Sequence, residues 1–132
     1  MTATGDWLWT GGYDTITDQR LKSTKLYTES GWQNFTELPE TTGDHCQVYV
    51  ENKGVYVIGG WNDEGSLDTT YELTSSNEWS KLSSLNTRRH DHACVEWEGG
   101  ILAIGVTVTV TYPVLKGLIR LRTNGFHSQH YQ

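Results

Sequence analysis

The feature that most constrains this sequence is a pair of adjacent glycines that occurs twice, each time after a short apolar stretch. Gly59-Gly60 follows residues 55–58 (VYVI), and Gly11-Gly12 follows residues 7–9 (WLW), so the pattern returns after just under fifty residues. A glycine pair tolerates positive φ angles and close approach by another backbone segment, so both pairs are expected where the chain is crowded. Repetition at this interval predicts a set of similar structural units.

The segments that follow the glycine pairs repeat as well. Each segment carries a tyrosine and then a tryptophan: Tyr27 with Trp32, and Tyr71 with Trp79. Each then enters a polar loop that ends in Asp-His, and a further strand-like stretch follows at residues 46–50 or 93–97. Gly54 and Gly99-Gly100 mark short hairpins that lead into the next apolar stretch.

The composition favours an all-β chain. The sequence has six tryptophans, seven tyrosines and only two prolines, and it lacks any long helical pattern. Four short strands in each period, joined by turns, predict one antiparallel sheet for each repeat. Such a sheet is the blade of a β-propeller.

These residues resemble a known family. A Gly-Gly pair after an apolar strand, then a tyrosine and a tryptophan, is similar to the kelch repeat, and the resemblance covers residues 7–106. It implies an all-β fold, an incomplete kelch-type β-propeller with two four-stranded antiparallel blades at 7–52 and 53–99. A partial third blade is expected at 100–112, and residues 113–132 are expected to form a divergent basic tail, ordered against the third blade or disordered from about residue 117.

The resemblance also implies structural roles for the repeated residues. The stretch 55–58 is expected to be the innermost strand of its blade, buried on both faces, and the repeated aromatic residues are expected to pack between blades. The expected structural signature is Gly11, Gly12, Tyr27, Trp32, Gly59, Gly60, Tyr71, Trp79 and Gly105. The third copy departs from the pattern, because Val106 stands where a second glycine is expected.

By the same resemblance, ligands are expected at a rim formed by the residues after each glycine pair and the loops before the Asp-His strands. The residues expected there are Tyr13, Trp61, Asn86, Arg88, Arg89, His90 and His92. The two arginines suit bidentate binding of carboxylates in an acidic peptide. The first copy has Glu40 and Asp44 at comparable positions, so solvated loop charges without a ligand are the alternative reading.

The function expected from the resemblance is a non-enzymatic protein–protein interaction module. The resemblance implies a fragment or isoform of a larger adaptor, for example a ubiquitin-ligase substrate receptor. The alternatives are a cytoskeletal, actin-associated structural protein and a fragment of a propeller enzyme. No catalytic residues and no cofactor are expected. A metal site of His90 and His92 with His45 or Asp91 is the alternative to a structural role for the Asp-His pairs, and the resemblance favours the structural role.

The net charge and the N-terminal sequence limit the kinds of partner and the compartment that are expected. The net charge of −6 does not favour nucleic acid or anionic membranes, and the N-terminal residues do not resemble a secretory signal, so a cytoplasmic location is expected. Cys46 and Cys94 are expected to be two buried thiols, and a disulfide or a metal pair are the alternatives. Two blades and part of a third would leave apolar sheet faces open, so self-association or additional blades are expected to cover them.

Overall fold

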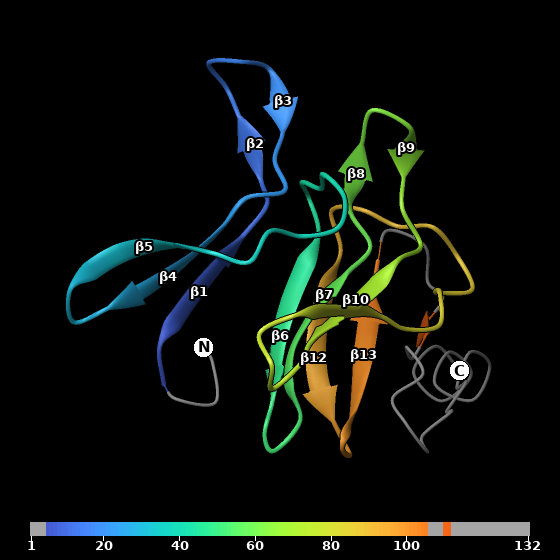
Figure 1. The fold of residues 1–132 in the computed structure, drawn as a ribbon. Helices are drawn as coiled ribbons and strands as arrows, with labels where there is room; N and C mark the ends of the chain where they lie inside the picture. Colours follow the sequence, from blue (N-terminus) through green and yellow to red (C-terminus); the bar gives the residue numbers. More distant parts are fainter. Residues whose placement is uncertain (1–4, 106–109, 112–132) are drawn as a thin grey trace.

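A computed structural model describes residues 5–105 and 110–111, and these residues form three antiparallel sheets and two small hairpins (Figure 1). The first sheet has the order β1-β4-β5, with β1 at Trp7–Thr10, β4 at Thr24–Thr28 and β5 at Gly31–Phe35. The second has the order β11-β10-β7-β6, with β6 at Cys46–Val50, β7 at Gly54–Ile58, β10 at Thr70–Leu73 and β11 at Trp79–Lys81. The third has the order β12-β13-β14, with β12 at Ala93–Trp97, β13 at Gly100–Ile104 and β14 at Val110–Thr111.

The small hairpins follow the two glycine pairs. The first consists of β2 at Tyr13–Asp14 and β3 at Gln19–Arg20, and the second of β8 at Trp61–Asn62 and β9 at Gly65–Ser66. The described residues contain no helix, and hence none that would be long and apolar enough to cross a membrane. The all-β class expected from the composition is confirmed for this part of the chain.

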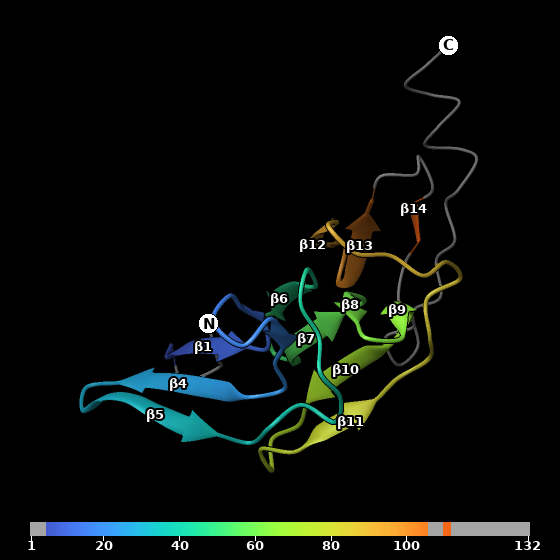
Figure 2. The same cartoon turned by 90° about the horizontal axis from the view of Figure 1, so that it is seen from above.

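The three sheets lie side by side in the order of the sequence, with apolar side chains between neighbouring faces (Figure 2). Between the first and second sheets lie Leu8, Val55 and Leu73, with Leu26, Phe35, Tyr49 and Trp79 packed around them. Between the second and third sheets lie Cys46, Val50, Tyr56, Ile58, Leu85, Ile101 and Ala103. The second sheet is therefore covered on both faces.

Strand β7 explains why its sequence is apolar at consecutive positions. Residues 55–58 are at most 2% exposed, because β6 and β10 pair with the two edges of β7 and the neighbouring sheets cover both of its faces. The predicted burial is confirmed. The predicted innermost position is not, since β6 forms the edge of this sheet and β7 is the second strand.

The boundaries between repeats also differ from the prediction. Residues 46–50 pair with β7, and residues 93–97 pair with β13, so each Asp-His strand belongs to the sheet that follows it. The division at 7–52 and 53–99 assigned both strands to the preceding unit. The tight turn between β6 and β7 decides the matter, because strands joined by such a turn hydrogen-bond to each other within one sheet.

The repeated aromatic residues are more deeply buried in the second sheet than in the first. Tyr71 is buried and Trp79 is partly buried, whereas Tyr27 and Trp32 are about half exposed, contrary to the prediction of core packing. The cause is positional: Tyr27 and Trp32 lie on the face of the first sheet that no other described sheet covers. Trp9 and Val57 are equivalent, because each lies two residues before a glycine pair. Lys25 pairs with Trp9 and Tyr71 pairs with Val57, so the counterpart of Tyr71 is Lys25 and not Tyr27.

The glycine pairs occupy a contact that excludes side chains. A Cβ atom at Gly59, where φ is 61°, would lie 2.6 Å from the carbonyl oxygen of Arg89 and 2.8 Å from Cε1 of His92. The same carbonyl accepts a 2.8 Å hydrogen bond from the N–H of Gly60. In the first copy, a Cβ at Gly11 would meet the carbonyl of Thr42.

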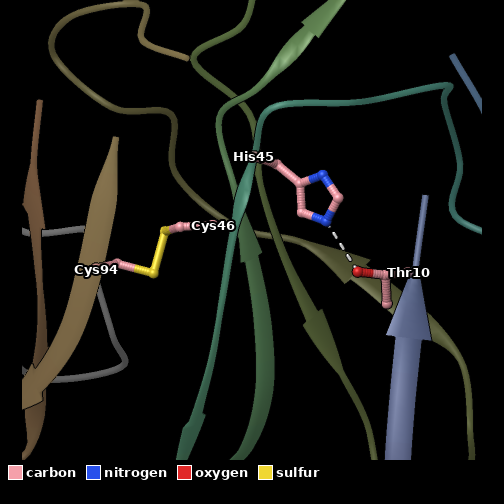
Figure 3. The surroundings of a disulfide bond; sticks show 4 residues. All are labelled: Thr10, His45, Cys46 and Cys94. Atoms are coloured by element: carbon pink, nitrogen blue, oxygen red, sulfur yellow. Dashed lines mark hydrogen bonds between the residues drawn. A yellow bond between two sulfur atoms is a disulfide. The ribbon is translucent and has the colours of Figure 1, made fainter. Parts of the chain in front are cut away.

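The two cysteines form a disulfide between β6 and β12, which corrects the expectation of free thiols (Figure 3). Their Cα atoms are 5.9 Å apart. Cys46 pairs with Ile58, the last residue of β7, whereas Cys94 pairs with Ala103, the residue before the last of β13. The two cysteines are therefore offset by one position in equivalent strands. Because side chains alternate between faces along a strand, this offset makes Cys46 and Cys94 point toward each other.

The bond bears on the compartment. Disulfides persist mainly in oxidising compartments, so the bond does not favour the cytoplasmic location expected from the sequence. Strand β14 pairs with β13, consistent with a further strand on the third sheet. The remaining expectations for the C-terminal region concern residues 106–109 and 112–132, which lie outside the described residues.

Reduction of the disulfide is expected to lower the free energy of unfolding by about 4 kcal/mol, because the bond closes a loop over a sequence separation of 48 residues. Urea denaturation with and without dithiothreitol measures the effect. The Cys46→Ala/Cys94→Ala double variant is the control, and its transition should not respond to reductant. Identical wild-type transitions under both conditions would contradict the bond.

Substitution of Gly59 by alanine is expected to destabilise the fold more than the same change at Gly65. Both glycines have positive φ angles, but no atom lies within 4 Å of a Cβ at Gly65. The strained backbone alone should cost about 1–3 kcal/mol at Gly65. Gly59→Ala adds the overlap with the Arg89 carbonyl and should cost roughly 2 kcal/mol more. Equal urea midpoints for the two variants would argue against the close contact.

Candidate binding rim

One edge of the sheets carries both small hairpins and the two loops that precede β6 and β12 (Figure 1, top). We call this surface the rim: hairpins β2–β3 and β8–β9, with loop residues 39–45 and 86–92. The rim contains the positions that the sequence predicted for ligand binding. It is built from two copies of the same local structure.

Five backbone hydrogen bonds in the loops occur once in each copy. In the first copy they are Gly11 N to Ser23 O, Gly12 N to Thr42 O, Leu21 N to Gly12 O, Leu38 N to Lys22 O and Thr42 N to Leu21 O. In the second they are Gly59 N to Thr69 O, Gly60 N to Arg89 O, Leu67 N to Gly60 O, Leu85 N to Asp68 O and Arg89 N to Leu67 O. The two glycine pairs therefore lie in equivalent surroundings.

The hairpins begin in the same way. An oxygen of the Asp14 side chain accepts a 2.9 Å hydrogen bond from the N–H of Ile16, and the side-chain oxygen of Asn62 does the same for Glu64. Such Asx turns are typical of Asp and Asn at the start of a tight turn. They hold Tyr13 and Trp61, the residues after each glycine pair, at the base of each hairpin.

In the first copy, Tyr13 contacts two charged groups. The Arg20 guanidinium lies 4.7 Å from the centroid of the Tyr13 ring, and it also pairs with Asp44 at 3.4 Å. The Tyr13 hydroxyl donates a hydrogen bond to Asp18, and this bond raises the pKa of Tyr13. Arg20, Asp44, Tyr13 and Asp18 thus contact one another at this end of the rim.

In the second copy, Trp61 packs edge-on against His90, with ring centroids 4.7 Å apart. Nδ1 of His90 lies 3.2 Å from the hydroxyl of Ser66, and the guanidinium of Arg88 donates to the carbonyl of Ser66 at 3.3 Å. The Arg88 side chain remains exposed. This end of the rim therefore presents an aromatic ring and the exposed guanidinium of Arg88.

The two copies are joined across the rim. Gly43 and Trp61 exchange backbone hydrogen bonds of 2.9 and 2.8 Å, and the N–H of Asp91 donates to the carbonyl of Asp44 at 2.9 Å. The first loop is consequently paired with the start of the second hairpin. The rim is a continuous surface of the first and second repeats.

The predicted site residues divide into exposed and buried groups. Asn86 and Arg88 are exposed, Tyr13 is 44% exposed, and Trp61, His90 and His92 are partly buried. Arg89 is only 5% exposed, with its guanidinium close to Gly105, so it lies beneath the rim. Of the two predicted arginines, only Arg88 is presented to solvent.

His45 is held by a defined set of hydrogen bonds (Figure 3). Its Nε2 lies 2.9 Å from the hydroxyl of Thr10, which donates its own proton to the side chain of Gln47 at 2.6 Å. Nε2 of His45 must then be the donor to Thr10. Gln47 in turn donates to the carbonyl of Leu8, so these groups connect β6 with β1.

The buried histidines are held neutral. Burial, together with the nearby Arg89 guanidinium and the neighbouring histidines, lowers the pKa of His92 to about 4. Burial likewise lowers the pKa of His45. These imidazoles therefore pack against the glycine pairs as uncharged rings, which agrees with the structural role expected for the Asp-His pairs.

Sequence reasoning did not identify Arg20 and Ser66 as rim residues. Both lie on the second strand of a hairpin, opposite Tyr13 and Trp61 respectively. The missed signal was the Asp14 and Asn62 side chains, which mark a turn soon after each glycine pair. Recognising that turn would have placed Arg20 and Ser66 beside the aromatic residues.

Within the described ranges, no three His, Cys, Asp or Glu side chains gather closely enough to hold a metal ion. No protein-family model and no curated protein matches the chain.

Stability is expected to fall as the pH is lowered from about 6.5 to about 4. The unfolded chain binds a proton at His92 near the usual histidine pKa, whereas the folded chain resists protonation until about pH 4. Thermal melts across this range measure the loss. His92→Gln should reduce the slope, whereas His90→Gln is the matched control because the His90 side chain is 40% exposed. An unchanged slope in His92→Gln would contradict this assignment.

Proposed function

We propose that this chain is a non-enzymatic protein-binding module of the kelch-type β-propeller class, and that its rim binds acidic peptide segments of a partner. The observation that carries the proposal is the aromatic and basic group around Trp61 on a rim with repeated architecture. The five loop hydrogen bonds that recur in both copies support the repeat on which the class depends.

The chemistry of the second copy supports an acidic ligand. Arg88 uses one guanidinium nitrogen on the carbonyl of Ser66, which fixes the side chain and leaves other donors exposed. A planar guanidinium with free donors pairs well with carboxylates. Trp61 and His90 add a partly buried aromatic surface beside it, a combination enriched at protein interfaces.

The first copy contributes less positive charge to the rim. Asp44 already neutralises Arg20 at 3.4 Å, and the Tyr71 hydroxyl donates to Glu40 at 2.9 Å. These carboxylates repel an acidic peptide and confine it to the end of the rim that carries Arg88. Specificity would then come from both the attraction at Arg88 and the repulsion at Asp44.

Two cellular roles fit a protein-binding module of this class. A role as part of a larger adaptor, such as a ubiquitin-ligase substrate receptor, is compatible with a binding rim. A cytoskeletal role is the second candidate within the same class. Measuring the binding of the chain to purified actin filaments and to acidic peptides in one experiment separates the two roles.

Arg88→Ala is expected to weaken binding of a fluorescein-labelled oligoglutamate peptide by about tenfold, the effect of losing one hydrogen bond to a charged group. Fluorescence polarisation measures the Kd. Lys81→Ala removes an exposed positive charge from β11, away from the rim, and should leave the Kd within about twofold. Equal weakening by both changes would indicate nonspecific charge attraction, and an oligolysine peptide should bind neither form.

A further inference from the structure

Two sheet faces at opposite ends of the described structure are apolar and exposed. The outer face of the first sheet carries Trp7, Trp9, Tyr27 and Trp32, of which Trp7 and Trp9 are 62% and 60% exposed. The outer face of the third sheet carries Val95, Trp97, Leu102 and Ile104, with Val95 and Ile104 at 49% and 43% exposure. Exposed apolar faces of this kind mark interaction sites.

The strand registers show what the face of the first sheet corresponds to. Trp9 pairs with Lys25 just as Val57 pairs with Tyr71, so Trp7 and Trp9 occupy the positions of Val55 and Val57. In the second sheet these two valines are 2% and 1% exposed, and Val55 packs against the first sheet. The exposed tryptophans therefore stand on the type of face that elsewhere in the molecule meets a preceding sheet.

The face of the third sheet is of the opposite type. Ile104 and Leu102 pair with Ala93 and Val95 in the same way that Ile58 and Tyr56 pair with Cys46 and Val48. Tyr56 and Ile58 pack against the third sheet and are 2% and 0% exposed. Leu102 and Ile104 therefore stand on the type of face that elsewhere meets a following sheet.

We propose that the outer face of the third sheet in one copy of the chain binds the outer face of the first sheet in a second copy. Both internal packings join these two types of face, and the two exposed faces supply one of each. The contact is consequently head-to-tail, and neither face is expected to pair with its own kind. Aromatic rings at Trp9 and Trp32, 6.3 Å apart, provide the large apolar surface that such contacts favour.

The stoichiometry follows from the number of sheets. A head-to-tail contact produces either a ring or an open filament, depending on whether the rotation closes. Two copies contribute six of the described larger sheets, which falls within the four to eight typical of closed propellers. The inferred head-to-tail contact depends only on the two types of sheet face. The inferred closure into a two-copy ring depends also on the propeller architecture proposed above.

The test uses sedimentation velocity on the full 132-residue chain and on one variant of each face. Wild type should sediment as a dimer. Trp7→Glu and Val95→Glu each introduce a carboxylate into one of the two faces. Because every contact between two copies of the same variant includes the changed face, each substitution should weaken association at least tenfold. Mixed together, the two variants retain one intact face each and should recover a heterodimer.

The control is Ile16→Glu, which adds the same charge at an exposed residue between β2 and β3 and should leave the dimer intact. Near-UV circular dichroism verifies folding; if either variant unfolds, Tyr27→Lys and Ile104→Lys replace the pair. A monomeric wild type, weakening by only one of the two variants, or a mixture that does not associate would overturn the head-to-tail contact. Wild-type assemblies larger than two copies would overturn the two-copy ring. Peptide binding at the rim is measured separately, so its failure is distinguishable.

Discussion

The contact between each glycine pair and one loop carbonyl is the interaction on which the described structure depends. The carbonyl of Thr42 or Arg89 lies against the first glycine and accepts a hydrogen bond from the second. This contact fixes the end of a central strand, the start of a rim hairpin and the loop that leads into the next sheet. A side chain at the first glycine would separate all three, so the rim and the packing of the sheets have a common origin.

Alternation of side chains along the strands determines the rest of the arrangement. Because consecutive residues point to opposite faces, Gln47 reaches the first sheet while its neighbour Cys46 reaches the third. The same rule divides β7 between the two apolar cores. Each sheet therefore has one face for its predecessor and one for its successor, which is the basis of the proposed association.

Much of this fold could be predicted from the sequence, and the failures have physical causes. The period, the all-β class and the hairpins at Gly54 and Gly99 were accessible, but a period alone does not say where a unit begins. The disulfide was missed because the cysteines were compared by spacing, whereas their one-residue offset in equivalent strands was informative. The burial of Arg89 beneath an exposed Arg88 depends on loop hydrogen bonds between Arg89 and both Leu67 and Gly60, which no local pattern reveals.

The disulfide between β6 and β12 also makes the connection between the second and third sheets stronger than the connection between the first and second. The second and third sheets share the disulfide and a hydrogen bond from Lys53 to the carbonyl of Gly99, whereas hydrogen bonds and apolar packing connect the first sheet to the second. Under oxidising conditions the N-terminal sheet is then the unit that can detach while its neighbours stay together. Amide protons of β4 and β5 would exchange before those of β7, and half of the rim would be lost by a local opening well short of global unfolding.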